Sequence, residues 1–130
     1  MKKVEVVAAV IAREGKILAV RRGVSKLDYI SEKWEFPGGK MEDGETEQQT
    51  IEREIFEELE MKIQAKEKLI TVEHTYPDFH LTMHTYFCDS VTTSPTLNEH
   101  IDFKWLAVEE LSQLDWAGAD VPIVEALIQR

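Results

Sequence analysis

The chain has 130 residues, 43% of them apolar and 31% charged, and a formal net charge of −10. A chain of this length can fold as one domain without disulfide bonds or structural metals, and its single cysteine, Cys88, excludes an internal disulfide framework. The negative charge excludes general affinity for nucleic-acid polymers and anionic lipid surfaces, and no apolar stretch approaches the ~20 residues that a membrane-spanning helix needs. We therefore expect one domain over residues 1–130, in the reducing environment of the cytoplasm.

The first third of the chain is rich in β-branched and apolar residues. Residues 4–12 predict a buried strand, and residues 17–22 predict a strand that returns alongside it as a hairpin. Residues 23–33 are typical of an exposed loop. Residues 34–40, "WEFPGGK", predict a short strand that ends at Pro37 and a glycine pair.

The strongest helix prediction covers residues 46–59. Thr46 can cap the N-terminus, with Gln49 as its partner in a capping box. Three apolar residues spaced four apart form a stripe that can enter a core, namely Ile51, Ile55 and Leu59.

The remaining elements mix strands and helices. Residues 65–77 and 80–91 predict two long antiparallel strands, and residues 102–108 predict another strand. Residues 108–114 and 120–129 predict two helices. Because strands and helices do not alternate strictly, the pattern favours an α+β fold with a mixed β-sheet between helices.

The helix over residues 46–59 is unusually acidic on one face. Glu54, Glu57 and Glu58 stand at i, i+3 and i+4, where like charges destabilise an isolated helix. A hard divalent cation such as Mg²⁺ or Mn²⁺ would offset this repulsion, and Arg53 could brace a carboxylate. The alternative is a solvated acidic face without a ligand.

The acidic helix and the glycine pair before it together resemble the Nudix box, G-x5-E-x7-R-E-U-x-E-E-x-G-U, where U is aliphatic. The matching residues are Gly39, Glu45, Arg53, Glu54, Ile55, Glu57, Glu58 and Met61. The resemblance extends to the MutT-type branch of the family in the opening strands, in residues 34–40 and in residues 76–87. It also covers "DFKWLAVEEL" and "GADVPIVEAL" near the end of the chain.

Glu60 is the one departure from the box, which usually has glycine there. That position follows the helix, where a left-handed residue is favoured, so glutamate would cost about 1 kcal/mol. We expect altered helix termination or modest strain rather than loss of chemistry.

The resemblance implies a Nudix-type α/β/α sandwich that hydrolyses a nucleoside diphosphate linked to another group. For the MutT-type branch that group is a further phosphate, and the products are a nucleoside monophosphate and pyrophosphate. It implies that Glu54, Glu57 and Glu58 hold Mg²⁺, for which Mn²⁺ can substitute, with help from the Gly38 carbonyl. Arg53 is implied to be a structural brace.

The implied reaction also needs a general base, which family members take either from the box or from a later loop. Glu99 is the candidate base from a later loop, with Glu54 and Glu57 as alternatives from the box. Arg22, at the end of a strand, is the candidate phosphate ligand. Glu99 as a plain loop carboxylate and Arg22 as a surface arginine are the competing interpretations.

Base recognition is assigned to Asp120, at a position where relatives that read 8-oxoguanine usually have asparagine. An ionised aspartate only accepts hydrogen bonds, which suits the exocyclic amine of cytosine and resembles the CTP pyrophosphohydrolase subgroup. Phe36, Phe79 and His80 are expected to wall the base pocket. Asp120 could instead be a simple helix N-cap.

Other functions remain open from the sequence. An 8-oxo-dGTP hydrolase or another Nudix specificity is the alternative within the family. A non-catalytic nucleotide-binding domain and an acidic protein-interaction domain are alternatives of other classes. The four histidines have no zinc-site spacing, and we expect a monomer or a homodimer that acts on a small nucleotide.

Overall fold

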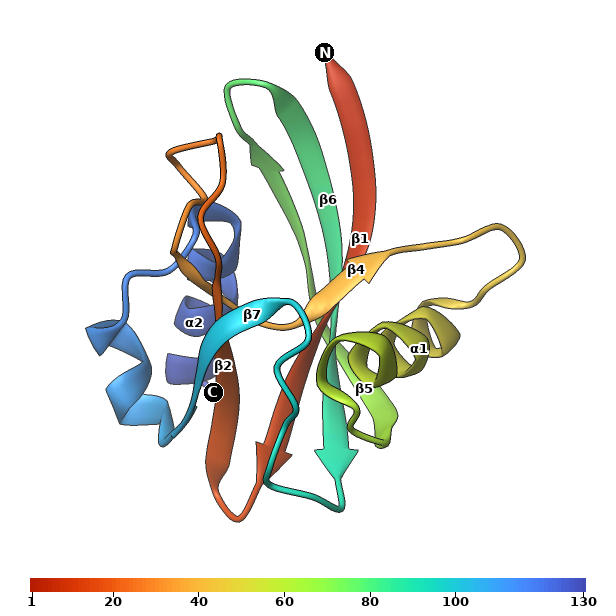
Figure 1. Ribbon diagram of the computed structural model, residues 1–130, viewed down its shortest axis with the longest axis vertical. Helices are drawn as coiled ribbons and strands as arrows, with labels where there is room; N and C mark the ends of the chain where they lie inside the picture. The colour runs from red at the N-terminus through yellow and green to blue at the C-terminus, as the bar shows by residue number, and fades with distance from the viewer.

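The computed structural model describes residues 1–130 and contains one seven-stranded mixed sheet with helices on both faces (Figure 1). The strands are β1 (Lys2–Arg13), β2 (Lys16–Arg22), β3 (Trp34–Glu35), β4 (Gly38–Lys40), β5 (Ile63–Thr75), β6 (Phe79–Ser90) and β7 (His100–Leu106). Their order is β3-β2-β1-β6-β5, with β4 paired to β1 and β7 paired to β2. The helices are α1 (Glu47–Leu59), the 3-10 helices η1 (Val108–Gln113) and η2 (Gly118–Asp120), and α2 (Val121–Ile128). The predicted α+β architecture is confirmed.

Strand β1 has a different main partner from the one that the sequence suggested. The predicted hairpin with β2 exists only near its turn, where Ala12 lies opposite Ile17. Along its length β1 instead runs parallel to β6, beginning with Lys2 opposite Phe79. As a result β1 and β2 diverge away from the turn (Figure 1), and other segments fill the space between them.

Residues 34–40 form two short strands rather than the single strand predicted. β3 pairs with β2, and β4 pairs with β1, where Gly39 lies opposite Val7. A Cβ on Gly38 would lie 1.9 Å from the Val7 carbonyl oxygen, so only glycine fits there. The segment thus bridges the diverging strands and brings the glycine pair to the middle of the sheet.

Helix α1 begins as predicted, and its apolar stripe covers one face of the sheet. The capping box is formed: the Gln49 backbone N–H donates to the Thr46 hydroxyl, and the Thr46 N–H donates to the Gln49 side chain. Apolar residues of α1 pack with β1 and β2 in one core cluster, and its members include Val7, Ala9, Ile11, Leu18, Val20, Ile51, Ile55 and Leu59. The buried apolar stripe therefore holds α1 against the sheet, and the carboxylates of the helix lie beside that stripe.

Helices η1 and α2 cover the other face. Leu111 of η1 and Ile123 of α2 are fully buried in a second cluster together with Trp34, Phe36 and Trp116. The 108–114 helix predicted from the sequence is a 3-10 helix. No helix of the protein combines the length and the apolar character needed to cross a bilayer.

Glu60 has the left-handed conformation that its position in the box predicted, with φ 53° and ψ 34°, and its N–H donates to the Phe56 carbonyl. We expect Glu60→Gly to raise the free energy of unfolding by about 1 kcal/mol, because only glycine adopts this conformation without steric cost. Urea unfolding of the wild type, Glu60→Gly and Glu60→Ala measures this. Glu60→Ala removes the same charge and keeps the strain, so equal gains from both variants would contradict the explanation.

Candidate active site

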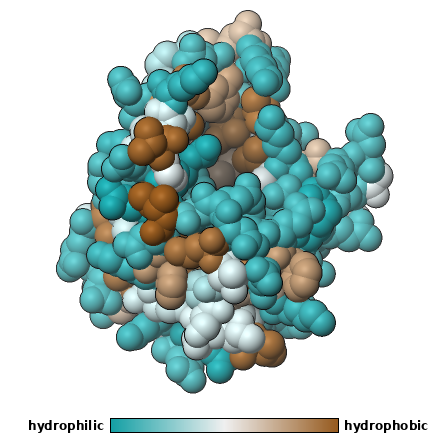
Figure 2. All heavy atoms as spheres, viewed as in Figure 1, coloured by the Kyte–Doolittle hydropathy of each residue, from teal (hydrophilic) through white to brown (hydrophobic).

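One face of the molecule carries a cleft made of two adjoining hollows. The first is mainly apolar, with a volume of about 390 Å³, and the second is polar and lined by three glutamates of the predicted site. Figure 2 shows hydrophobic side chains deep in this face and hydrophilic ones around the opening. Five residues line both hollows, namely Arg22, Glu35, Gly38, Gly39 and Lys40. The divergence of β1 from β2 and the short strand β4 create this shared floor.

The polar hollow brings together Glu54 and Glu58 of α1 with Glu99 from the loop before β7. Glu58 is only 6% exposed, and its Oε2 atom is buried without a hydrogen-bond partner. A Cβ on Gly39 would lie 2.3 Å from the Glu54 carboxylate, so glycine lets this carboxylate pack against β4. The hollow therefore offers carboxylate oxygens to a ligand that can approach closely.

Arg53 braces the loop before α1 and the acidic face. Its guanidinium donates to Glu45 at 2.6 and 2.9 Å, to Glu54 at 3.0 Å and to the Lys40 carbonyl at 3.2 Å. The Arg53 contact lowers the pKa of Glu45 to about 2, and the Glu45 contact raises the pKa of Arg53. Arg53 therefore links the loop before α1, strand β4 and the acidic face of the helix.

Glu57 differs from its two neighbours on the helix. It is exposed, does not line the polar hollow, and accepts from Arg53 at 3.2 Å. No group of three or more acidic, histidine or cysteine side chains is arranged to hold a metal ion. The predicted convergence of all three glutamates is therefore limited here to Glu54 and Glu58.

The residues of the polar hollow nevertheless fit a hard divalent cation. Its glutamates, Glu54, Glu58 and Glu99, offer carboxylate oxygen atoms, which Mg²⁺ and Mn²⁺ prefer. The unpartnered oxygen of Glu58 is the kind of buried polar atom that a bound ion would satisfy. Burial, and then the nearby Glu54 carboxylate, raise the pKa of Glu58 to about 10, so a cation would have to displace a proton from it.

The loop that carries Glu99 is attached to the C-terminal end of α1. Asn98 donates its side-chain amide to the Glu57 carbonyl at 2.9 Å and its backbone N–H to the Glu58 carbonyl at 3.1 Å. The Thr96 N–H donates to the Leu59 carbonyl. These bonds satisfy carbonyls that a helix leaves free at its end, and they hold Glu99 beside the acidic face.

The apolar hollow contains the predicted base-recognition residue. Asp120 is 5% exposed and lines this hollow, as do Phe36 and Phe79. Its Oδ1 atom accepts from the Phe36 N–H at 2.9 Å, and Phe36 stacks on Trp116 with a 4.7 Å separation between ring centroids. The predicted pocket residues Asp120, Phe36 and Phe79 therefore lie together.

Asp120 occupies the N-cap position of α2, but its side chain does not cap the helix. Burial and the nearby Glu35 carboxylate raise the pKa of Asp120 well above its usual range. A neutral carboxyl can donate as well as accept a hydrogen bond. The preference for cytosine that was expected from an ionised aspartate therefore applies to only one of the two protonation states of Asp120.

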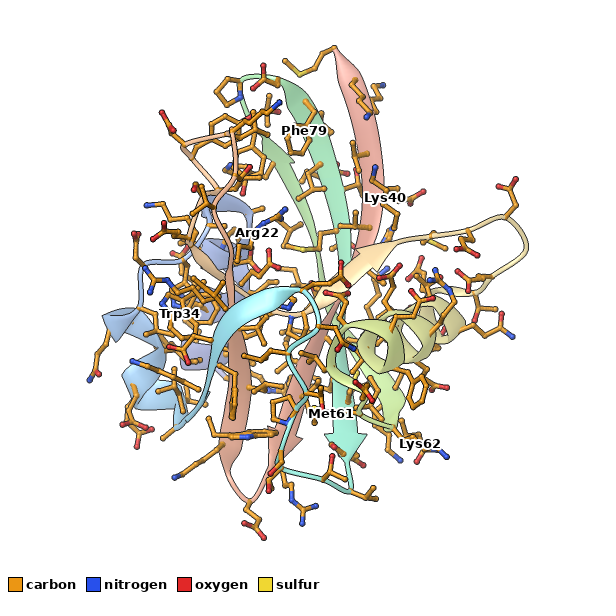
Figure 3. The ribbon with its side chains drawn as sticks, in the orientation of Figure 1. Arg22, Trp34, Lys40, Met61, Lys62 and Phe79 are labelled. Carbon is orange, nitrogen blue, oxygen red and sulfur yellow. The ribbon has the colours of Figure 1, made fainter.

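The other two predicted ligand residues have different positions. Arg22 lines both hollows and lies 3.4 Å from the Glu35 carboxylate; Figure 3 shows Arg22, Lys40 and Phe79 around the same opening. His80 lines neither hollow, because its ring faces Thr75 and Glu73 at 2.8 Å each. His80 on β6 therefore lies outside the predicted pocket.

The sequence did not identify several residues of the cleft, among them Glu35, Tyr76 and His100. Glu35 and His100 line the polar hollow, and Tyr76 lines the apolar hollow, where its hydroxyl accepts from the Ala119 N–H. Glu35 lies three residues before Gly38 in "WEFPGGK", and this proximity could have identified it. His100 and Tyr76 carry no local signal, because only tertiary packing brings them to the cleft.

The chain is similar to known proteins along nearly its whole length. The NUDIX domain model matches residues 6–126. The CTP pyrophosphohydrolase of Escherichia coli (strain K12) is 34% identical over 98% of this chain and 93% of its own length. The 8-oxo-dGTP diphosphatase of the same organism is 28% identical over 98% of each chain.

A solved structure is also similar to this chain over nearly its whole length. The solution structure of the MutT protein of methicillin-resistant Staphylococcus aureus, titled a Nudix hydrolase, superposes with a TM-score of 0.74. It is 39% identical and covers 99% of this chain and 98% of its own. The family model and these full-length similarities show that the chain belongs to the Nudix hydrolase family.

Proposed function

We propose that the protein is a divalent-cation-dependent nucleoside triphosphate pyrophosphohydrolase that acts on CTP, dCTP or oxidised pyrimidine nucleotides. The observation that carries the proposal is the pair of hollows with a shared floor. An apolar hollow with a buried carboxyl suits a base, and the polar hollow beside it suits phosphates bridged by a cation. The full-length similarity to a CTP pyrophosphohydrolase supports the choice of base.

The reaction follows from these positions. Water adds to the β-phosphorus, and the bond from that phosphorus to the α–β bridging oxygen breaks, which releases a nucleoside monophosphate and pyrophosphate. A cation in the polar hollow, Mg²⁺ or Mn²⁺, would neutralise phosphate charge and orient the water. Glu54, Glu58 and the Gly38 carbonyl are its proposed ligands, together with Glu57, whose side chain would have to turn from Arg53 toward the hollow.

The remaining residues have supporting roles in the proposal. Glu99, exposed beside Glu58, takes the proton from water, with Glu54 and Glu57 as alternatives. Arg22 binds a phosphate where the two hollows meet. We further propose that the enzyme acts in the cytoplasm, as a monomer or homodimer, on free nucleotides rather than on a polymer, which its charge of −10 would repel.

A second candidate is the hydrolysis of 8-oxo-dGTP. The raised pKa of Asp120 favours it, because a neutral carboxyl offers the donor and acceptor that asparagine would supply. The similarity to an 8-oxo-dGTP diphosphatase over the whole chain supports it as well.

A panel of nucleoside triphosphates distinguishes the two candidates. We expect pyrophosphate release to be fastest with CTP, dCTP or an oxidised cytosine nucleotide, and to stop when EDTA removes the cation. The measurement is pyrophosphate and monophosphate formation at matched concentrations of CTP, UTP, dCTP, an oxidised dCTP, dGTP and 8-oxo-dGTP. A preference for 8-oxo-dGTP would replace the first candidate with the second, and activity that survives EDTA would contradict the cation.

A further inference from the structure

His100, the first residue of β7, is buried behind the proposed cation ligands. It is 8% exposed, and its Nε2 atom lies 2.9 Å from the Glu35 carboxylate and 3.8 Å from Glu58 Oε1. Its Nδ1 atom is buried without a partner. The imidazole therefore makes one hydrogen bond, to Glu35, and its Nε2 atom lies between the Glu35 and Glu58 carboxylates.

Two features of the fold place this side chain. The register between β2 and β7 shifts between Arg21 and Arg22, so that Arg22 lies opposite His100 and Ile101 is the extra residue of a β-bulge. Just before β7, Asn98 is bound to carbonyls at the C-terminal end of α1. His100 is thus held by the pairing of β7 with β2 on one side and follows a loop bonded to α1 on the other.

Glu35 extends the contact toward the substrate. Its carboxylate accepts from His100 and lies 3.4 Å from Arg22, and Glu35 lines both hollows. The polar chain therefore runs from Arg22 through Glu35 and His100 to Glu58. It joins the proposed phosphate ligand to the proposed cation ligand.

We propose that His100 is a positioning residue: its Nε2–H holds the Glu35 carboxylate and, through its position against Glu58, keeps the Glu58 carboxylate aimed at the divalent cation. This inference rests on the proposed function, because it takes Glu58 as a cation ligand. Ligating carboxylates are commonly oriented by partners of this kind, and loss of such a partner weakens metal affinity. If His100 only filled space, an apolar side chain would serve as well and would avoid the cost of burying the Nδ1 atom without a hydrogen-bond partner.

The test compares two polar substitutions that differ in where the amide lies. His100→Gln places a donor near the former Nε2 position, whereas His100→Asn reaches only the former Nδ1 position. His84→Gln is the matched control, because His84 also bonds a glutamate, Glu5 at 2.7 Å, away from the cleft. The readout is Mn²⁺ affinity without nucleotide, measured by electron paramagnetic resonance, followed by kcat and KM.

We expect His100→Asn to weaken Mn²⁺ binding by about tenfold or more and His100→Gln by much less. His84→Gln should bind Mn²⁺ as the wild type does. The kcat of His100→Asn should fall in parallel, with KM for the nucleotide little changed. Equal Mn²⁺ affinities for His100→Asn and His100→Gln would overturn the proposal, whether both are strong or both are weak.

The same set of variants, together with Glu58→Gln, distinguishes failure of the positioning role from failure of the proposed function. If Glu58→Gln binds Mn²⁺ as tightly as the wild type, the assignment of Glu58 as a ligand fails, and the positioning role fails with it. If Mn²⁺ affinity follows the His100 substitutions but no nucleotide is hydrolysed, the positioning role stands and the proposed activity fails. Circular dichroism of each variant confirms that the fold is retained.

Discussion

Glu58→Gln is expected to lower kcat by about a hundredfold to a thousandfold, because a bound cation contributes several kcal/mol to stabilisation of a phosphoryl-transfer transition state. Glu58 is the most buried carboxylate of the polar hollow, and its Oε2 atom has no other partner. Glutamine keeps the size of the side chain but cannot ionise, so it lacks the negative charge that Glu58 would carry with a cation bound. The loss should appear in kcat more than in KM, because the charge acts on the transferring phosphate.

The same variant should change how cation binding depends on pH. The pKa of Glu58 is raised to about 10, mainly by burial, so below that pH a proton competes with the cation. Cation affinity in the wild type should therefore rise as pH increases toward 10, up to tenfold per pH unit if one proton is released. Isothermal titration calorimetry with Mn²⁺ between pH 6 and pH 9 measures this slope.

Glu52→Gln is the matched control for both measurements. Glu52 lies on the same helix, is exposed, and accepts from the Ala65 N–H away from the cleft. Glu52→Gln replaces a carboxylate on the same helix by the same amide. Because Glu52 lies away from the cleft, this variant should keep the kcat and the pH slope of the wild type. If Glu58→Gln retained the wild-type slope, Glu58 would not be the group whose proton the cation displaces.

Asp120→Asn is expected to reduce the preference for CTP over UTP by about tenfold and to make that preference independent of pH. CTP and UTP differ at C4, where cytosine has an amine that donates and uracil has a carbonyl that accepts. Ionised Asp120 accepts from the amine, and neutral Asp120 can donate to the carbonyl. Because burial raises the pKa of Asp120, the ionised fraction, and with it the preference for CTP, should increase with pH in the wild type.

The measurement is the ratio of kcat/KM for CTP to that for UTP across pH 6 to pH 9, in the wild type and the variant. Taking a ratio cancels the pH dependence of the cation site, which both substrates share. Asp115→Asn is the control, because Asp115 is exposed and pairs with Lys33. A flat ratio in the wild type, or the same slope in Asp120→Asn, would show that Asp120 does not read the base.

The parts of the fold that the sequence predicted correctly depend on short-range patterns. The acidic helix, its capping box and its buried stripe all follow from residues within about one turn of each other, and Thr46, Gln49 and Ile55 have the expected environments. The left-handed conformation of Glu60 follows from its place just after the helix. The family resemblance was visible in the sequence for the same reason, because its box is a contiguous pattern.

Tertiary structure decided which of these residues meet. The parallel pairing of β1 with β6 separates β1 from β2 and makes room for the cleft, and no local pattern distinguishes that partner from a hairpin partner. Glu57 shares a helical face with Glu58 yet turns to Arg53, and His100 reaches Glu58 only because a bulge and a distant loop place it there. The sequence by itself determined the chemistry of the acidic helix, because side chains on one helix face are ordered by local geometry. Packing between segments far apart in the chain decided which carboxylates are buried, what supports them and where a base can bind.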